Sequence, residues 1–446
     1  MLNYFKENLN QLPLPLGVIL AHFPYAYRPG MGAIYKERVS EIDSFKSMDL
    51  GERKRFIFER VKEISSHAYK KVPFYNRVYK AAGVRPDRFD SFENLFDLPV
   101  ISKADLQEVD IDERSCKTEN KYVANTGGTS GNPLSFYIQP SSIGHEWAHM
   151  HAIWRDLGFR QNNLKMLLAG RAVIKGLAQY DSIRHHFAVN IYKGWSEVSD
   201  IICDLIKRYR INYLHGYPSA IFDLILWASE NHRELLSVLT DNIKGLLLGS
   251  EYPSPVLRGK VESLINAQSI SWYGHTERAV LARELVGAHG VYYPFQTYGF
   301  CEALSFEGQH HLLGTSYYNY ASPLIRYDTG DLVAPVFLGE LLESFSVSRG
   351  RSGEYIFDRN GNKVFLTALI FGRHHSAFNF CSSVQVSQQR KGVAKIFVVL
   401  IGKDISMTDV VRGFDFSDVL VDFDFFVVSE PKKTKSGKVS LLIDEL

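Results

Sequence analysis

The alternation of apolar and polar positions in the middle of the chain predicts a repeated strand-and-helix pattern. Short apolar runs alternate there with longer segments whose apolar residues recur at helical spacing. The expected strands are 134–139, 165–169, 212–215 and 244–248, and the expected helices are 141–157, 198–209, 219–229 and 255–265. We expect Ser141 to cap the first of these helices and Gly158 to end it. Such alternation is typical of an α/β fold with a largely parallel sheet flanked by helices.

The N-terminal region departs from this pattern. Its first fifty residues combine several prolines with little periodicity, so we expect an irregular arm packed on the main body. Residues 53–71 then carry apolar side chains at helical spacing among charged ones, and Pro73 ends the run, which predicts an amphipathic helix. Ser102 and Asp105 have the spacing of a capping box at the start of a short helix.

The C-terminal region changes to short β-type runs. Asn360-Gly361 lies between two extended segments and is a strong hairpin signal, and 396–401 and 419–428 are further β-type runs. We therefore predict two domains. A large N-terminal domain covers 1–349, and a small, mobile α+β domain covers 350–446.

Composition narrows the class of partner. The 446 residues are 45% hydrophobic and 22% charged, with a formal net charge of +2, which is too balanced to favour nucleic acid or an anionic membrane. The cysteines, at positions 116, 203, 301 and 381, are scattered and indicate neither a disulfide framework nor a cysteine zinc site. We find no signal peptide or transmembrane pattern. These features predict a cytoplasmic protein that binds small molecules.

A stretch rich in glycine and hydroxyl groups precedes the first of the predicted strands. Residues 125–133 read Asn-Thr-Gly-Gly-Thr-Ser-Gly-Asn-Pro. Glycines let backbone N–H groups approach an anion, and the hydroxyls add further donors, so the composition suits phosphate. The spacing is not that of a Walker A loop. Such a stretch is more often a plain surface turn, so the phosphate interpretation depends on other elements.

Two stretches supply chemistry that suits the rest of a nucleotide. Residues 272–277, Trp-Tyr-Gly-His-Thr-Glu, bring an aromatic ring, a hydroxyl and a carboxylate together, and such a carboxylate can bind Mg²⁺ between phosphate oxygens. In residues 327–331, Asp331 follows a glycine turn and can accept hydrogen bonds from both hydroxyls of a ribose. Taken alone, 272–277 is also compatible with a loop that carries a surface carboxylate, and 327–331 is more often an ordinary β-turn.

Two more stretches lie toward the C-terminus. Residues 350–353, Gly-Arg-Ser-Gly, combine glycines that permit a hinge with Arg351, which can meet an anion. Residues 431–438 end in Thr-Lys-Ser-Gly-Lys. A charge run near a terminus is usually a solvated tail, but that interpretation leaves the Ser-Gly-Lys ending unexplained.

In this order the motifs resemble those of the adenylate-forming superfamily, which includes acyl-CoA synthetases, luciferases and the adenylation domains of peptide synthetases. Within it, the chain is most similar to the phenylacetate-coenzyme A ligase branch and its capsule-biosynthesis relatives. The resemblance runs from about residue 61 to 438. Besides the glycine loop, it depends on Lys71–Asn76, Leu98–Lys103, Gly216–Ser219 and Pro323–Asp331.

The resemblance implies roles for individual residues. Those implied to bind ATP or AMP are Thr126, Gly127, Gly128, Thr129, Ser130, Gly131, Tyr273, Gly274, Asp331 and Arg351. Within this set, Tyr273 would flank the adenine and Asp331 would bind the ribose hydroxyls. Three residues would be catalytic: Thr276 at the α-phosphate, Glu277 on magnesium, and Lys438 as the adenylation lysine of the small domain.

The implied reaction is ATP- and magnesium-dependent adenylation of a carboxylic acid, followed by acyl transfer to coenzyme A. We expect the acid near Tyr217, Gly249 and Trp272. Gly353 stands where many relatives carry an acidic residue two positions after the hinge arginine, and 362–372 also departs from the usual pattern. An amine or hydroxyl acceptor in polysaccharide or secondary-metabolite biosynthesis therefore remains an alternative.

Two alternatives come from other classes of protein. His145-Glu146-Trp147-Ala148-His149 is formally the H-E-x-x-H motif of zinc proteases. Against this, the next glutamate after His149 is Glu197, and Gly158 closes the predicted helix early. The other alternative is a nucleotide-binding protein without catalytic turnover. The chain carries both an expected magnesium carboxylate and an expected adenylation lysine, and their presence together argues against this alternative.

Overall fold

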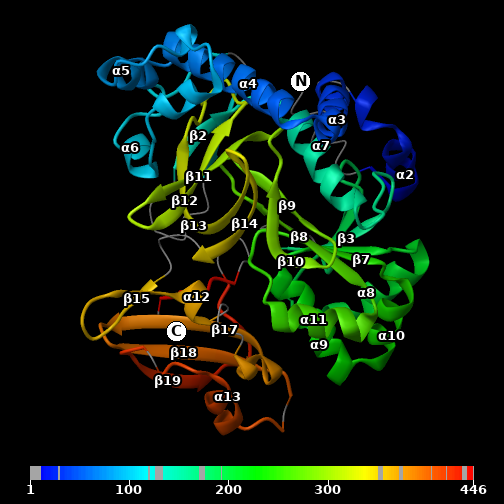
Figure 1. Ribbon diagram of the computed structural model, residues 1–446. Coiled ribbons are helices and arrows are strands. Elements are labelled where there is room, and N and C mark those ends of the chain that lie inside the picture. The colour runs from blue at the N-terminus through cyan, green and yellow to red at the C-terminus, as the bar shows by residue number, and fades with distance from the viewer. Residues whose placement is uncertain are drawn as a thin grey trace.

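The structure is a computed structural model that describes residues 12–28, 31–118, 121–125, 134–169, 176–191, 193–349, 355–370, 375–402, 404–417, 419–433 and 439–444 (Figure 1). Its described part is built around a 12-stranded sheet, in the order β11-β12-β13-β14-β10-β9-β8-β7-β6-β3-β5-β4. The α/β class predicted from the sequence is confirmed.

One half of this sheet is parallel. Its strands are β5 (His186–Val189), β3 (Lys165–Leu168), β6 (Tyr213–Gly216), β7 (Gly245–Leu248) and β8 (Gln268–Gly274). Among them, β3, β6 and β7 were predicted, because a parallel strand buried on both faces tends to form an apolar run, whereas β5 was not predicted. In Figure 1 they lie between α7 (Ser142–Arg155) and the group α8 (Trp195–Tyr209), α9 (Pro218–Asn231), α10 (Arg233–Asn242) and α11 (Pro255–Ile265).

The other half is antiparallel. It consists of β9 (Leu281–Leu285), β10 (Ala288–Pro294), β14 (Leu341–Arg349), β13 (Tyr327–Leu338), β12 (Gln309–Ser316) and β11 (Gly299–Phe306), and β4 (Ala178–Asp181) adds an antiparallel strand at the opposite edge. This half extends the sheet beyond the parallel arrangement that the sequence pattern predicts.

The helix predicted at 53–71 is present as α4 (Leu50–Lys71). Ile57, Val61 and Ile64 are fully buried, and Asp49 and Glu52 form a capping box at its start. The chain continues into α5 (Pro73–Ala81). The capping box predicted at Ser102 is also present, at the start of α6 (Lys103–Gln107).

The prediction of an irregular N-terminal arm is wrong. The region forms α2 (Leu14–His22) and α3 (Gly32–Ser47), and α3 packs on α7. The helical pattern of α3 is hard to recognise in the sequence, because one of its core-facing side chains is charged. Arg38 is buried, pairs with Glu41 at 2.5 Å and lies over the ring of Tyr318.

The predicted cap of α7 is also wrong at one end. Ser141 has helical backbone angles, and its side chain makes no capping bond. The hydroxyl of Ser142 donates instead to the carbonyl of Gln139 at 2.8 Å. At the other end Gly158 has φ +77°, a conformation that favours glycine, and it ends the helical region as predicted.

The C-terminal part forms two small sheets. β15 (Tyr355–Phe357) and β16 (Lys363–Phe365) make the predicted hairpin, with Gly361 at φ +85° in its turn. β17 (Cys381–Arg390), β18 (Val393–Leu400) and β19 (Asp422–Val427) form a three-stranded sheet, with α12 (Leu366–Ile370) and α13 (Met407–Gly413) beside it. Residues 351–354 lie outside the described ranges, so the domain boundary near them stays a prediction.

The C-terminal sheet is packed against the helices of the main body. One hydrophobic cluster contains Ile221 and Ile225 of α9 together with Val384 and Val386 of β17, and α9 contacts β17 directly. In Figure 1 the C-terminal strands lie beside α9 and α11. Along the described ranges, we find no helix with the length and apolarity needed to cross a bilayer.

Candidate functional site

The carboxyl ends of the parallel strands bring several predicted site residues together. Gly216 ends β6, Gly249 follows β7, and Trp272, Tyr273 and Gly274 end β8. The backbone N–H of Gly249 donates to the carbonyl of Gly216 at 3.0 Å, so the first two loops are joined. In open α/β sheets, ligands bind outside these strand ends.

Two of these positions require glycine. Gly216 has φ +154°, and a Cβ there would lie 2.0 Å from the carbonyl oxygen of Leu168. A Cβ on Gly249 would lie 2.3 Å from the ring of Trp272. The indole therefore packs directly on the Gly249 loop, whereas Tyr217 is 8% exposed and belongs to the hydrophobic cluster of α8, α9 and β17.

Tyr273 and Asp331 meet, although 58 positions separate them in the sequence. The Tyr273 hydroxyl donates a hydrogen bond to Oδ2 of Asp331, and its ring packs edge-on against Phe345 at a centroid distance of 5.4 Å. Asp331 is 6% exposed, and its backbone N–H donates to Oγ1 of Thr329 at 3.2 Å. An aromatic ring and an oriented carboxylate thus stand side by side.

Glu277 lies on the turn after β8 and is 6% exposed. His275 Nε2 accepts from the N–H of Val280 at 3.2 Å, so its proton is on Nδ1, which donates to Glu277 Oε2 at 3.1 Å. On the other side, the hydroxyl of Tyr327 donates to Glu277 Oε1 at 3.4 Å. The carboxylate is held in one orientation by two donors, while Thr276 on the same turn is exposed.

These contacts fit a magnesium site of the kind found in phosphoryl chemistry. Mg²⁺ is usually bound by one or two carboxylates together with substrate phosphates and water, rather than by an all-protein cage. Glu277 supplies such a carboxylate, and it is bonded to Tyr327, which begins the strand that carries Asp331. The described ranges contain no group of three or more His, Cys, Asp or Glu residues that could hold a metal ion.

Two of the motifs on which the family resemblance depends contact the strand of this site. The hydroxyl of Tyr75 donates to the carbonyl of Pro323 at 3.0 Å and accepts the N–H of Ile325 at 3.2 Å. Ile101 forms a parallel bridge with Tyr327. Its N–H donates to the carbonyl of Arg326 at 3.0 Å, and its carbonyl accepts the N–H of Asp328 at 2.9 Å. The segments 71–76 and 98–103 therefore position the strand that carries Asp331.

Arg326 completes this support. It is buried, and its guanidinium forms a bidentate pair with Glu302 at 3.0 and 3.2 Å. The third nitrogen, Nη1, donates to the carbonyls of Phe96 and Leu98 at 2.8 and 2.7 Å. Burial raises the pKa of Glu302, and the guanidinium opposes this rise. The arginine in this motif is thus a structural residue.

Strained backbone accompanies each of these segments. Ser250, Arg278 and Arg326 have φ of +71°, +57° and +45°, and they follow Gly249, Glu277 and Ile325 in the sequence. Non-glycine residues in this region cost of order 1–3 kcal/mol each and persist only where the surroundings impose them. Three segments of the candidate site are therefore held in specific conformations by the fold.

Several predicted residues lie outside the described ranges: Thr126, Gly127, Gly128, Thr129, Ser130, Gly131, Arg351 and Lys438. The strands that flank the glycine loop, β1 (Tyr122–Asn125) and β2 (Ser135–Ile138), pair antiparallel, with Asn125 opposite Ser135. Val439, which follows Lys438 in the sequence, donates its N–H to Oε1 of Glu251 at 3.0 Å.

Sequence reasoning missed three residues that the structure places here. His275 and Tyr327 orient Glu277, and Glu251 binds the C-terminal tail. His275 and Tyr327 lie within motifs already singled out, so their positions beside functional residues were the available signal. Glu251 had no such signal, because its partners are backbone N–H groups.

The H-E-x-x-H stretch on α7 is part of the core. His149 donates from Nδ1 to the carbonyl of His145 at 2.9 Å, and its Nε2 accepts from the hydroxyl of Thr297 at 2.9 Å. Glu146 accepts from the hydroxyl of Tyr298 at 2.5 Å. Burial lowers the pKa of His149 to about 3 and that of His145 well below its usual range. Because the lone pair of His149 is already used, this arrangement argues against a zinc protease.

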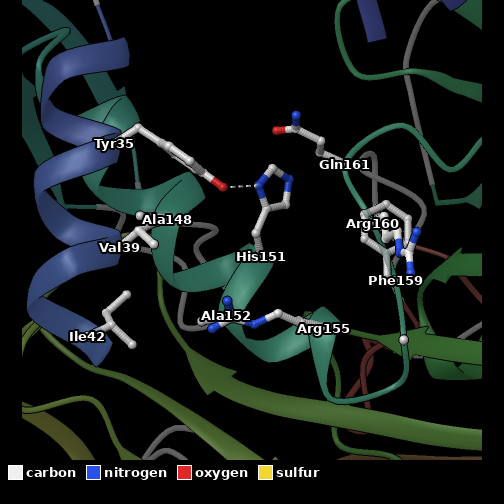
Figure 2. A pocket seen from close by; sticks show the side chains of 11 residues that line it. Tyr35, Val39, Ile42, Ala148, His151, Ala152, Arg155, Phe159, Arg160 and Gln161 are labelled. Atoms are coloured by element: carbon white, nitrogen blue, oxygen red, sulfur yellow. Dashed lines mark hydrogen bonds between the residues drawn. The ribbon is translucent and has the colours of Figure 1, made fainter. Parts of the chain in front are cut away.

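A cavity of about 470 Å³ lies between α3 and α7, apart from the strand ends (Figure 2). His151 of α7 faces it and is hydrogen-bonded through Nδ1 to the hydroxyl of Tyr35 at 3.0 Å. Phe159, which lines its other side, packs on Tyr213 at the beginning of β6. The cavity is thus near the amino ends of the parallel strands, and its arginines at 155 and 160 are solvent-exposed.

No model of a protein family matches the chain. Two curated proteins are similar to it in sequence. Protein CapK of Staphylococcus aureus is 21% identical over 283 residues, which cover 62% of this chain and 61% of CapK. Phenylacetate-coenzyme A ligase of Escherichia coli (strain K12) is 24% identical over 311 residues, covering 66% and 69% of the two chains. The chain therefore spans between three fifths and seven tenths of the length of these relatives.

Solved structures share the fold over most of their length. A 2-hydroxyisobutyryl-CoA ligase in the postadenylation state, in complex with R3-HIB-AMP, has a TM-score of 0.65 at 17% identity, with 90% of this chain and 91% of that chain covered. The same ligase in the thioesterification state, with 2-HIB-AMP and CoA, has a TM-score of 0.55 at 18% identity and equal coverage. The present arrangement is thus more similar to the postadenylation state.

An acyl acid amido synthetase has a related fold, with a TM-score of 0.56 at 11% identity and coverage of 92% and 94%. The fold is therefore shared by enzymes named for different acyl acceptors. Together, these similarities confirm the fold and the superfamily resemblance predicted from the motifs.

Proposed function

Starting from its place in the adenylate-forming superfamily, in the branch of phenylacetate-coenzyme A ligase and CapK, we propose that the protein activates a carboxylic acid with ATP. The products of the first step are acyl-AMP and pyrophosphate. The observation that carries the proposal is a pair of contacts between β8 with its following turn and β13: Tyr273 donates to Asp331, and Glu277 accepts from Tyr327. We assign the reaction to the cytoplasm, where ATP is available.

Tyr273 and Asp331 bind the nucleoside in this proposal. The ring of Tyr273 lies beside the adenine, and its hydroxyl holds one oxygen of Asp331. The other lone pairs of that carboxylate accept from the ribose hydroxyls. Because the Thr329 hydroxyl and Gly330 fix the turn, the carboxylate needs little reorganisation when the nucleotide arrives.

Glu277 and Thr276 act at the phosphates. A carboxylate attacking an α-phosphate brings two anions together, and bound magnesium reduces their repulsion. Glu277, oriented by His275 and Tyr327, would hold that ion. Thr276 is exposed on the same turn, where it is available to the α-phosphate.

The glycine loop, Arg351 and Lys438 take roles carried over from the superfamily. Residues 126–131 bind the β- and γ-phosphates, Arg351 lies near the nucleotide at the hinge, and Lys438 places its ammonium between the reacting carboxylate and the α-phosphate. The pairing of β1 with β2 supports the first assignment, since it brings both ends of the glycine loop to one hairpin.

Coenzyme A is the acceptor that we propose for the second step. Similarity to phenylacetate-coenzyme A ligase and the fold of a CoA ligase favour it. A second candidate, an amine or hydroxyl acceptor, is favoured by similarity to CapK and by the related fold of an acyl acid amido synthetase. Mass spectrometry of the product formed with each acceptor distinguishes the two.

The proposal is tested by exchange of labelled pyrophosphate into ATP across a panel of aryl, fatty and amino acids. We expect exchange with at least one acid, dependent on Mg²⁺ and unaffected by a zinc-selective chelator. If the protein binds ATP but catalyses no exchange with any acid, it is a nucleotide-binding protein without this activity, and the proposal fails.

A further inference from the structure

Glu251 connects the loops of the main body to the C-terminal tail. It follows β7 in the loop that contains Gly249, directly after Ser250 with φ +71°. One carboxylate oxygen accepts the N–H of Ser219, in the first turn of α9, at 3.1 Å. The other accepts the N–H of Val439 at 3.0 Å. Hydrogen bonds to a carboxylate are about twice as strong as neutral ones.

The tail is held from its other side by the C-terminal sheet. Lys433 and Val439 form an antiparallel bridge, so they are the two sides of a narrow stem. The amide of Gln385 on β17 is 1% exposed, donates to the carbonyls of Lys432 and Ser440 at 2.9 and 2.7 Å, and accepts the N–H of Lys432 at 2.7 Å. Gln385 therefore fixes both sides of the stem on the small sheet.

A second side chain of the main body faces this stem. Asp223, also on α9, accepts from the indole N–H of Trp195 at 2.7 Å. Burial raises the pKa of Asp223, and the positive charge of Lys433 on the stem opposes that rise. One side of the stem is thus near Glu251 and the other is near Asp223, so α9 and the β7 loop together receive the tail.

We propose that Glu251 is a positioning residue that latches the tail to the main body during adenylation and releases it for acyl transfer. This inference rests on the proposed function. Val439 directly follows Lys438 in the sequence, so its bond to Glu251 anchors the tail one residue after the proposed adenylation lysine. The present arrangement is more similar to the postadenylation state of a CoA ligase than to its thioesterification state. Rotating the small sheet must break the bond from Val439 to Glu251, but it leaves those to Gln385 intact.

The latch itself is tested without any catalytic assay. Hydrogen–deuterium exchange of the peptide 432–442 is followed by mass spectrometry in the wild type, Glu251→Ala and Glu251→Gln. Glu234→Ala is the matched control, because it removes an exposed carboxylate of α10 that pairs with Lys207. We expect about tenfold faster exchange in Glu251→Ala, a smaller increase in Glu251→Gln, which keeps one acceptor oxygen, and no change in the control. Unchanged exchange in both Glu251 variants overturns the latch.

The consequence for catalysis is read as a ratio of half-reactions. We expect Glu251→Ala to lower pyrophosphate exchange about tenfold, while consumption of supplied acyl-AMP with the true acceptor is unchanged or faster. Glu251→Gln should restore part of the exchange activity. If both half-reactions fall equally, Glu251 has only a structural role. If Glu251→Ala does not fold, the same comparison is made with Glu251→Gln. A wild type without pyrophosphate exchange defeats the proposed function, whereas the deuterium measurement still decides the latch.

Discussion

Replacing Asp331 by asparagine tests the proposed ribose contact at the level of single atoms. One oxygen of the aspartate accepts from the Tyr273 hydroxyl, and in the proposed function the carboxylate also accepts from the ribose hydroxyls. An asparagine of nearly the same size offers one carbonyl oxygen and one NH₂ group. Whichever way the amide turns, either Tyr273 or the ribose meets a donor in place of an acceptor. Loss of a charge-assisted hydrogen bond is worth about 1.5–3 kcal/mol, so we expect ATP to bind about 10- to 150-fold more weakly.

The assay is calorimetric titration with ATP and with 2′,3′-dideoxy-ATP, which lacks both ribose hydroxyls. The wild type should prefer ATP, and Asp331→Asn should bind the two nucleotides with nearly equal affinity. Asp328→Asn is the matched control, since Asp328 lies in the same turn, accepts from the N–H of Gly330 and pairs with His311. Thermal unfolding should show both variants folded.

Two results would refute this reasoning. Unchanged ATP affinity in Asp331→Asn removes the residue from the site. An equal loss of affinity for ATP and for the dideoxy nucleotide shows that the carboxylate acts on some other part of the ligand, or only on Tyr273. In either case the contact between the Tyr273 side chain and the Asp331 carboxylate would serve to stabilise the fold and not to bind the ribose.

Three further predictions concern catalysis and stability. Lys438→Ala should lower acyl-AMP formation about 100- to 1,000-fold and still consume supplied acyl-AMP; near wild-type adenylation would return the lysine to a solvated tail. Glu277→Gln should raise the Mg²⁺ concentration needed for half-maximal pyrophosphate exchange, and an unchanged requirement would count against its role as metal ligand. The third prediction uses His149, whose pKa falls from 6.5 to about 3 on burial, so the unfolded chain takes up its proton below pH 6.5 and stability is lost as the pH falls toward 3. Between pH 7 and 5 this amounts to about 2 kcal/mol, and a folded His149→Gln variant should lose that much less in urea unfolding than the wild type; parallel pH profiles would contradict it.

The sequence could predict those elements whose buried positions are occupied mainly by apolar residues. The strands β3, β6 and β7 are buried along almost their whole length and are mainly apolar, so their positions could be predicted. Helix α3 was missed because Arg38 occupies a core position, where Glu37 and Glu41 pair with its charge and Tyr318 packs against it in the folded structure. The pattern of apolar and polar residues in one segment cannot show that a buried charge is compensated by a partner 280 positions away.

The candidate site divides in a similar way. Tyr273, Glu277 and Asp331 were identified because each lies in a local motif whose residue types suit a nucleotide. That Tyr273 bonds to Asp331 could not be predicted, since it depends on how β8 of the parallel half and β13 of the antiparallel half are placed relative to each other. Glu251 illustrates the remaining limit, because a carboxylate that binds backbone N–H groups places no requirement on the side chains of its partners.

The apolar contact between α9 and β17 gives the small sheet a temperature-dependent preference. Separating these elements puts side chains such as Ile221 and Val386 into water, and near room temperature the opposing free energy is almost entirely entropic. That opposition weakens on cooling. In the proposed two-step reaction the small sheet parts from α9 before acyl transfer, so we expect the balance between the two half-reactions to shift toward acyl transfer as the temperature falls.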